Sequence, residues 1–130
     1  MERHFHQELE DLKMTVLRMA SLSERNAEKA IKALLERNAD LAEEVIETDH
    51  EINAKELEVD EMSLKLLALG QPMAKDLRFI VGCMRIVVFL ERVGDQSVNI
   101  SERAIYLTSR PALPFSTLLE QLSTLCMKMY

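Results

Sequence analysis

The apolar residues of this chain recur at alternating steps of three and four positions, and this spacing restricts the possible folds more than any other feature. Such spacing is typical of long helices that bury one side in a bundle. The first stretch covers residues 6–37 and keeps apolar, small and amide-bearing side chains on one stripe. Its members are Leu9, Leu12, Val16, Met19, Ser23, Asn26, Ala30 and Ala33.

Two further stretches, 40–69 and 73–109, show the same spacing. The stripe of the second contains Ala42, Val45, Asp49, Ile52, Glu56, Val59, Ser63 and Leu66. The stripe of the third contains Leu77, Ile80, Met84, Val87, Glu91, Asp95, Val98 and Ile105. Three amphipathic helices of similar length therefore follow one another along the chain.

The breaks between these stretches are short, because the chain has only three Gly and three Pro residues. Asn38 separates the first helix from the second, with Asp40 as the expected N-cap. Gly70 stops the second helix and Pro72 stands at the start of the third. The sequence predicts an all-α fold, an antiparallel three-helix bundle with short turns.

After the third helix, Pro111 and Pro114 precede one more amphipathic segment, residues 115–130, which predicts an additional C-terminal helix. Offset by 110 positions, this segment aligns Phe115, Leu119, Glu120, Leu122 and Met129 with Phe5, Leu9, Glu10, Leu12 and Met19. The alignment favours two domains: a three-helix repeat at 1–110, and a linker with the first helix of a truncated second repeat at 111–130.

The C-terminal segment presents a contiguous apolar surface, which a monomer rarely leaves open. The residues concerned are Leu118, Leu119, Leu122, Leu125, Cys126 and Met129. A homodimer, with these helices paired or exchanged between chains, is expected to bury them. The alternatives are a segment that folds back as a fourth helix or one that frays.

Charge and hydropathy exclude other classes of function. The net charge of −6 and the pI near 5.1 argue against nucleic-acid binding, which depends on clustered basic residues. The most apolar stretch, 79–90, contains Arg85 and is too short for membrane insertion. The opening residues lack the apolar run of a signal peptide, so a cytoplasmic location is expected.

Polar residues interrupt all three stripes at one level of the predicted bundle. Reflecting residue numbers across the turns at Asn38 and Gln71 sets Asp49 between Glu91 and Asp95. The layer contains Asp49, Asn53, Glu91 and Asp95, with Ser23 and Asn26 behind them. Unpaired carboxylates are costly to bury, and their oxygens are the ligands that hard metal ions prefer. The layer is therefore a candidate metal site, unless these carboxylates pair with Arg85, Arg92 or Lys55 or face solvent.

The segment 71–102 resembles the PhoU family of phosphate-signalling proteins. The matching residues are Gln71-Pro72, Ala74, Asp76-Leu77-Arg78, Glu91-Arg92-Val93-Gly94-Asp95 and Asn99, and the stretch 45–53 is similar to its counterpart in the family. The resemblance implies a metal motif at Asp49/Asn53 and Glu91/Asp95, with Asn99, Asn26 and Ser23 as weaker candidates. Asn53 replaces the aspartate of the stronger motif, which is expected to weaken the site.

The resemblance also implies a function. Family members are non-enzymatic negative regulators of the phosphate-starvation response that link a phosphate ABC transporter to a sensor histidine kinase. A complete member carries two repeats, so the sequence is either a fragment or a short homologue that completes itself by pairing. The metal is not identified, and iron, zinc, manganese and magnesium are all candidates. The alternatives are a carboxylate-rich bundle with hydrolase or metal-storage activity, and a purely structural assembly module.

Overall fold

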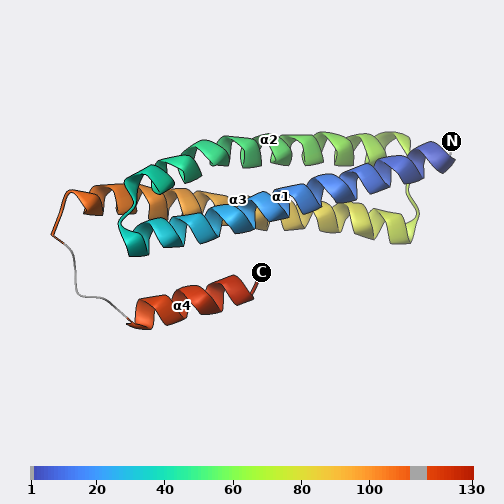
Figure 1. Ribbon diagram of the computed structural model, residues 1–130. Coiled ribbons are helices and arrows are strands. Elements are labelled where there is room, and N and C mark those ends of the chain that lie inside the picture. The colour runs from blue at the N-terminus through green and yellow to red at the C-terminus, as the bar shows by residue number, and fades with distance from the viewer. Residues whose placement is uncertain (1, 112–116) are drawn as a thin grey trace.

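The computed structural model describes residues 2–111 and 117–130, and these residues form helices and turns without a strand. The helices are α1 (Glu2–Glu36), α2 (Ala39–Leu69), α3 (Ala74–Thr108) and α4 (Thr117–Lys128). Helices α1 to α3 lie side by side as an antiparallel bundle, and α4 runs along one side of it (Figure 1). The predicted all-α bundle with an additional C-terminal helix is confirmed.

Helix α1 begins at Glu2, four residues before the predicted start at residue 6. The added turn has a packing partner, because the ring of Phe5 lies directly against Gly70, where any Cβ atom would collide with it. Gly70 ends α2, and its N–H donates to the carbonyl of Leu66 at 3.0 Å. A glycine at this turn thus lets the first turn of α1 close over the junction of α2 and α3.

The turn between α1 and α2 is built by Arg37 and Asn38. The Oδ1 atom of Asn38 accepts from the N–H of Leu41 at 3.0 Å, so Asn38 is the N-cap of α2. The prediction of Asp40 as N-cap is wrong; Asp40 lies in the first turn, where its charge favours the helix N-terminus. Arg37 adopts a left-handed backbone conformation (φ 56°).

Arg37 also joins this turn to the far end of α3. Its guanidinium donates to the carbonyls of Leu107 at 3.1 Å and Thr108 at 3.4 Å, and to that of Arg110. Carbonyls at a helix C-terminus have no partner within the helix, and a cation there satisfies them. The side chain of Arg37 therefore fixes where α3 ends and where the chain leaves the bundle.

Two apolar clusters of different character fill the bundle. The larger one lies toward the α2–α3 turn and contains Leu9, Leu12, Val16, Met19, Ile52, Val59, Leu66, Ile80, Cys83, Val87 and Leu90. The smaller one, near the α1–α2 turn, consists of Ala33, Ala42 and Ala104. The helices approach one another through small residues at that end. All eight residues of the predicted α1 stripe are buried, and six of the eight on α2.

Of the stripe predicted for α3, only Ile80 and Val87 are buried; Leu77 is exposed, and Cys83 is buried in place of Met84. Beyond Val87 the buried side of α3 is rotated by about one residue from the prediction. Its buried residues there are Leu90, Gly94, Ser97, Ser101 and Ala104, whereas the predicted stripe passed through Glu91, Asp95, Val98 and Ile105. Small side chains permit close approach to the alanines of α1 and α2, which turns the larger residues toward the side of the bundle. The acidic residues of α3 consequently lie beside the core and not in it.

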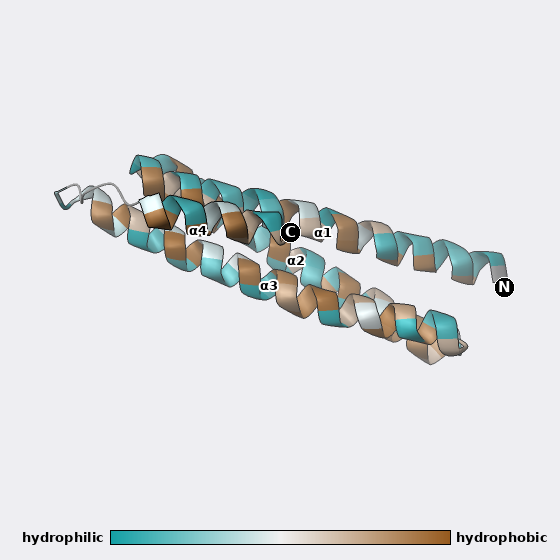
Figure 2. Cartoon of the chain, turned by 90° about the horizontal axis from the view of Figure 1, so that it is seen from below, coloured by the Kyte–Doolittle hydropathy of each residue, from teal (hydrophilic) through white to brown (hydrophobic). Residues whose placement is uncertain are grey.

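Helix α4 lies beside the bundle and packs against α1 (Figures 1 and 2). None of its residues from Thr117 to Lys128 is buried. The six side chains of the predicted apolar surface, Leu118, Leu119, Leu122, Leu125, Cys126 and Met129, are all exposed. The segment nevertheless folds back along its own bundle as a fourth helix, which was one of the alternatives to the dimer, and Leu119, Leu122 and Cys126 line a recess that faces α1 and α3. Phe115 of the proposed internal repeat lies outside the described residues, and the domain division at residue 110 stays a prediction. Within the described residues, no helix combines the length and hydropathy needed to cross a bilayer.

Candidate metal centre

The facing sides of α2 and α3 bring together the four residues that the sequence selected, and the line of side chains along this α2–α3 seam is called the acidic groove. Asn53 donates from Nδ2 to Oδ2 of Asp49, one turn earlier on α2, at 3.4 Å. Burial raises the pKa of Asp49, and the negative charges of Asp95 and Glu91 on α3 raise it further, while the hydrogen bond from Asn53 and the charge of His50 oppose the shift. The carboxylate of Asp49 is thus close enough to both acidic residues of α3 for their charges to act on it.

Gly94 explains how Asp49 comes so close to α3. A Cβ atom built on Gly94 would stand 2.9 Å from Oδ1 of Asp49, closer than real contacts of this kind. Oδ1 is buried and accepts no hydrogen bond from the described residues. Leaving a buried acceptor without a donor costs about 1–3 kcal/mol. The glycine therefore makes room for a carboxylate whose own surroundings do not satisfy it.

Glu56 is a fifth member of the groove that the sequence placed on the α2 stripe but did not assign to the site. Burial, a hydrogen bond with Glu91, and the charges of Glu91, Asp60 and Asp95 together raise the pKa of Glu56 to about 7. A hydrogen bond between two carboxyl groups requires a proton on one of them. The spacing of the sequence could have identified Glu56, because it follows Asn53 by three positions and therefore lies on the same side of α2.

The groove is shallower than the sequence predicted. Asp95 is exposed and Glu91 is partly buried, because α3 is rotated relative to the predicted stripe. Asp49 and Asn53 are partly buried as well, so the four residues lie along one edge of the bundle and not in the expected internal layer.

The weaker candidates serve other roles. Asn26 donates to the carbonyl of Val45 at 3.1 Å, and Ser23 donates to the carbonyl of Leu90 at 3.3 Å, so both use their polar atoms to join α1 to its neighbours. The Ser23 hydroxyl also forms a short hydrogen bond with the Tyr130 hydroxyl. Asn99 is exposed and donates to Gln96 at 3.4 Å.

None of the ion pairs in the described part of the chain includes a carboxylate of the groove, and His50 is the one cation whose charge acts on Asp49. Lys55 pairs with Glu58 at 3.0 Å, and the other pairs join Lys29 to Glu44, Lys65 to Glu8 and His4 to Glu8. The alternative in which Lys55, Arg85 or Arg92 neutralises the groove is therefore not seen among residues 2–111 and 117–130. The groove keeps an excess of negative charge.

The side chains of the groove do not form a closed cage of ligands. In the described residues, no three His, Cys, Asp or Glu side chains gather closely enough to hold one ion. The groove offers carboxylates that act on one another, most strongly Asp95 on Asp49 and Glu91 on Glu56, with the amide of Asn53 hydrogen-bonded to Asp49. This set of oxygen donors fits a hard cation that keeps part of its water shell better than zinc in a closed four-ligand site.

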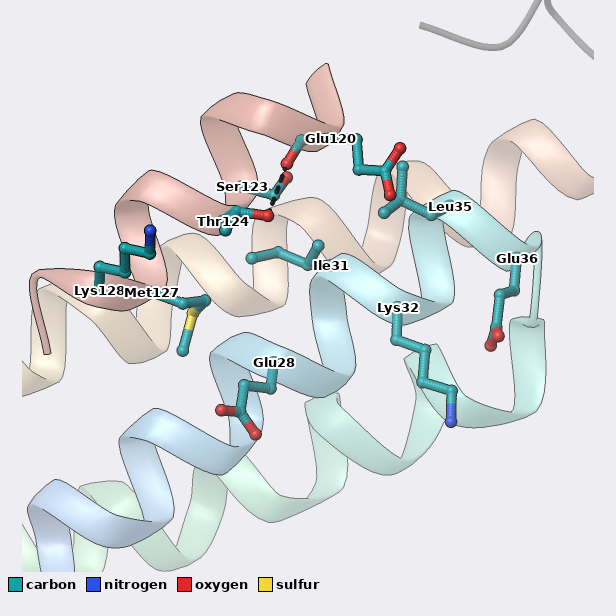
Figure 3. Close-up of a pocket in the computed structure, with 10 residues that line it drawn as sticks. All are labelled: Glu28, Ile31, Lys32, Leu35, Glu36, Glu120, Ser123, Thr124, Met127 and Lys128. Atoms are coloured by element: carbon teal, nitrogen blue, oxygen red, sulfur yellow. Dashed lines mark hydrogen bonds between the residues drawn. The ribbon is translucent and has the colours of Figure 1, made fainter. Parts of the chain in front are cut away.

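A separate recess of about 620 Å³ lies between α1 and α4 (Figure 3). Its lining comes from Glu28, Ile31, Lys32, Leu35 and Glu36 of α1 and from Glu120, Ser123, Thr124, Met127 and Lys128 of α4. Polar groups of opposite charge stand at its rim, and none of the predicted metal-site residues reaches it. The recess reflects the loose contact between α4 and the bundle.

Comparison with known proteins points to one family. The family model described as the PhoU domain matches residues 16–104. The phosphate-specific transport system accessory protein PhoU homolog of Aquifex aeolicus is 45% identical over 106 residues, which cover 82% of this chain and 48% of that protein. The PhoU protein of Escherichia coli K12 is 34% identical over 118 residues, covering 91% of this chain and 49% of that protein.

Solved structures agree. The crystal structure of PhoU from Pseudomonas aeruginosa superposes with a TM-score of 0.93 at 35% identity, covering 96% of this chain and 60% of that one. The PhoU structure from Streptococcus pneumoniae gives 0.87 at 31% identity, covering 96% of this chain and 58% of that one. The chain spans about half the length of the curated relatives it matches.

Proposed function

This chain belongs to the PhoU family, and from that premise we propose that it is a non-enzymatic, cytoplasmic regulator of phosphate uptake and phosphate-starvation signalling. Its relatives are named as accessory proteins of a phosphate-specific transport system, which supports a role in controlling that transport. The three-helix bundle would supply one repeat of such a regulator. Its partners would be the transporter's ABC subunit and a sensor histidine kinase.

The acidic groove gives this adaptor a metal-binding function. The supporting observation is a set of carboxylates that form no ion pair within the described residues, together with a buried Asp49 oxygen that accepts no hydrogen bond there. A cation between Asp49 and Asp95 would compensate both charges, and Asn53 would supply a neutral oxygen. Magnesium, manganese and iron fit these oxygen donors, with water completing the coordination.

The metal site is tested with two variants, one that removes an aspartate of the site and one that removes a glutamate outside it. Wild-type protein, Asp95→Ala and Glu43→Ala are dialysed against each metal, and the bound metal per chain is measured by mass spectrometry. Glu43 is an exposed carboxylate on the same helix as Asp49 and serves as the matched control. We expect Asp95→Ala alone to lose metal. Equal metal content in all three proteins would show that Asp95 is not a ligand. Equal loss in both variants would show that the metal responds only to the net negative charge of the chain.

The regulatory role is tested in cells that lack the endogenous regulator. We expect a phosphate-starvation reporter to be repressed by the wild-type gene in high phosphate, and to stay derepressed with a gene carrying Asp49→Ala and Asp95→Ala. Repression by the double variant at equal protein level would separate regulation from the groove. A reporter unaffected by the wild-type gene would contradict the regulatory role of this chain.

The exposed face of α4 supports a homodimer as the working state. Each copy presents Leu118, Leu122 and Leu125 to solvent, and pairing or exchange of α4 between copies would bury them. Light scattering during size-exclusion chromatography decides between the states. A single species of 14.9 kDa at tens of micromolar protein contradicts the dimer, and a dimer that dissociates when the chain is truncated after Pro114 supports the role of α4.

A further inference from the structure

Helix α2 concentrates the negative charge of the molecule. It contains ten acidic and two basic residues, a net charge of −8, whereas the whole chain carries −6, so all other segments together carry +2. The acidic residues are Asp40, Glu43, Glu44, Glu47, Asp49, Glu51, Glu56, Glu58, Asp60 and Glu61. Only some of them line the groove with α3. Glu47, Glu51, Glu58 and Glu61 are exposed on the outward side of the helix.

The same outward side carries large apolar side chains. Leu57 and Leu64 are 67% and 59% exposed, and they stand seven positions apart, which places them two turns apart on one side of α2. Ala54, Glu61 and Ala68 continue this stripe and are exposed as well. Helix α4 lies on the side of the bundle away from α2 and contacts α1 instead (Figure 1). The outward face of α2 is therefore uncovered in the described part of the chain.

We propose that the outward face of α2, defined by Ala54, Leu57, Glu61, Leu64 and Ala68, docks a positively charged amphipathic helix of a protein partner. An amphipathic helix places apolar anchors at steps of three, four and seven, which matches the spacing of Leu57 and Leu64. The surrounding glutamates select a basic partner and steer its approach. Because α1 and α3 hold the inward side of α2, the face is ordered before the partner arrives.

Charge also decides against other occupants. Nucleic acid and anionic lipid are repelled by a helix of net charge −8. Two copies pairing through the same face would oppose their α2 helices and bring like charges together. A basic helix from a different protein is the occupant that satisfies both the leucines and the glutamates. The inference goes beyond the proposed metal site, since none of the five residues of the face is a candidate ligand.

The test uses the full chain and a defined probe. The probe is a labelled synthetic helix of about 18 residues, roughly five turns, with leucines at i, i+3, i+4 and i+7 and lysines elsewhere. A scrambled peptide of identical composition, whose leucines do not share a side, controls for charge alone. Binding is measured by fluorescence anisotropy to the wild-type chain, to Leu57→Ser/Leu64→Ser and to Met14→Ser/Leu17→Ser. Met14 and Leu17 are 46% and 52% exposed on α1 and form the matched control pair.

We expect the amphipathic peptide to bind the wild-type chain at least about tenfold more tightly than the scrambled peptide does, and Leu57→Ser/Leu64→Ser to lose about tenfold or more in affinity. The α1 variant is expected to bind as the wild type does. Equal weakening in both variants, or equal binding of both peptides, overturns the proposal. A fall in the molar mass of Leu57→Ser/Leu64→Ser in light scattering overturns it as well, because the face would then join two copies of this chain.

Discussion

Replacing Gly94 with alanine separates the stability of the bundle from the geometry of its acidic groove. An added Cβ would meet Oδ1 of Asp49 at 2.9 Å and Cγ2 of Ile52 at 3.6 Å. The second distance is an ordinary contact, so only the carboxylate must move. It is the free end of a side chain, and it leaves a position where it accepts no hydrogen bond. Alanine also favours a helix interior over glycine by about 1 kcal/mol.

We therefore expect Gly94→Ala to raise the free energy of unfolding by about 1 kcal/mol, which corresponds to a rise in Tm of about 4 °C. The displaced Asp49 becomes more hydrated, so its pKa falls toward the ordinary value, since burial is the largest cause of its upward shift. Thermal unfolding measures the first effect, and a carbon-13 NMR titration of the Asp49 carboxyl group measures the second. Bound metal is expected to decrease in parallel.

Gly82→Ala is the matched control, because a Cβ at this position of α3 meets nothing within 4 Å. It is expected to give the same gain in stability with no change in the pKa of Asp49 or in bound metal. The reasoning is refuted when Gly94→Ala is less stable than the wild type, which would show that Asp49 cannot leave its position. It is refuted equally when the pKa of Asp49 is the same in both variants.

Three further changes test other parts of the structure. The pKa of Glu56 is raised from 4.5 to about 7, so the protonated carboxyl group stabilises the fold. This contribution is fully present below pH 4.5 and is lost as the pH rises through 7. Between pH 4.5 and 8.5, Tm is therefore expected to fall less in Glu56→Gln than in the wild type. Arg37→Ala removes the donor to the last carbonyls of α3 and is expected to lower the free energy of unfolding by about 1 kcal/mol in urea titrations, with an unchanged midpoint as the contradicting result. Gly70→Ala forces a Cβ against the Phe5 ring and is expected to cost about 1–3 kcal/mol, a loss that Phe5→Ala in the same chain reduces if the ring is its cause.

The periodicity of the sequence predicted the fold because three long stripes with the same three-and-four spacing leave few arrangements other than a bundle. It was accurate for α1, where large and small residues share one unbroken stripe. On α3 it was already wrong at Leu77 and Met84, and it failed throughout after Val87, because the prediction followed the larger apolar residues and passed over Gly94 and Ser97. Which of two adjacent stripes is buried depends on how closely the helices approach, and Gly94 and Ser97 set that distance only in the assembled bundle.

The sequence predicted which residues of α2 and α3 meet at the candidate site. It did not predict the hydrogen bonds that these residues form. Reflection across the turns placed Asp49 near Glu91 and Asp95, and the electrostatic coupling among them agrees with that placement. The hydrogen bond of Glu56 with Glu91 could not be derived, since an uncertainty of one helical turn is larger than the reach of a carboxyl group. The hydrogen bond from Ser23 to the carbonyl of Leu90 could not be derived either, because it depends on the direction of the Ser23 side chain.

The two apolar clusters imply that the bundle does not open uniformly. Local unfolding is least costly where little apolar surface is buried, and the end lined by Ala33, Ala42 and Ala104 buries far less than the leucine-rich end. Amide hydrogens at the α1–α2 turn and near the end of α3 are therefore expected to exchange with solvent orders of magnitude faster than those around Leu12 and Ile52. The chain leaves α3 for α4 at this same labile end. Local opening there would loosen the part of α1 that faces α4, while the leucine-rich half of the bundle stays closed.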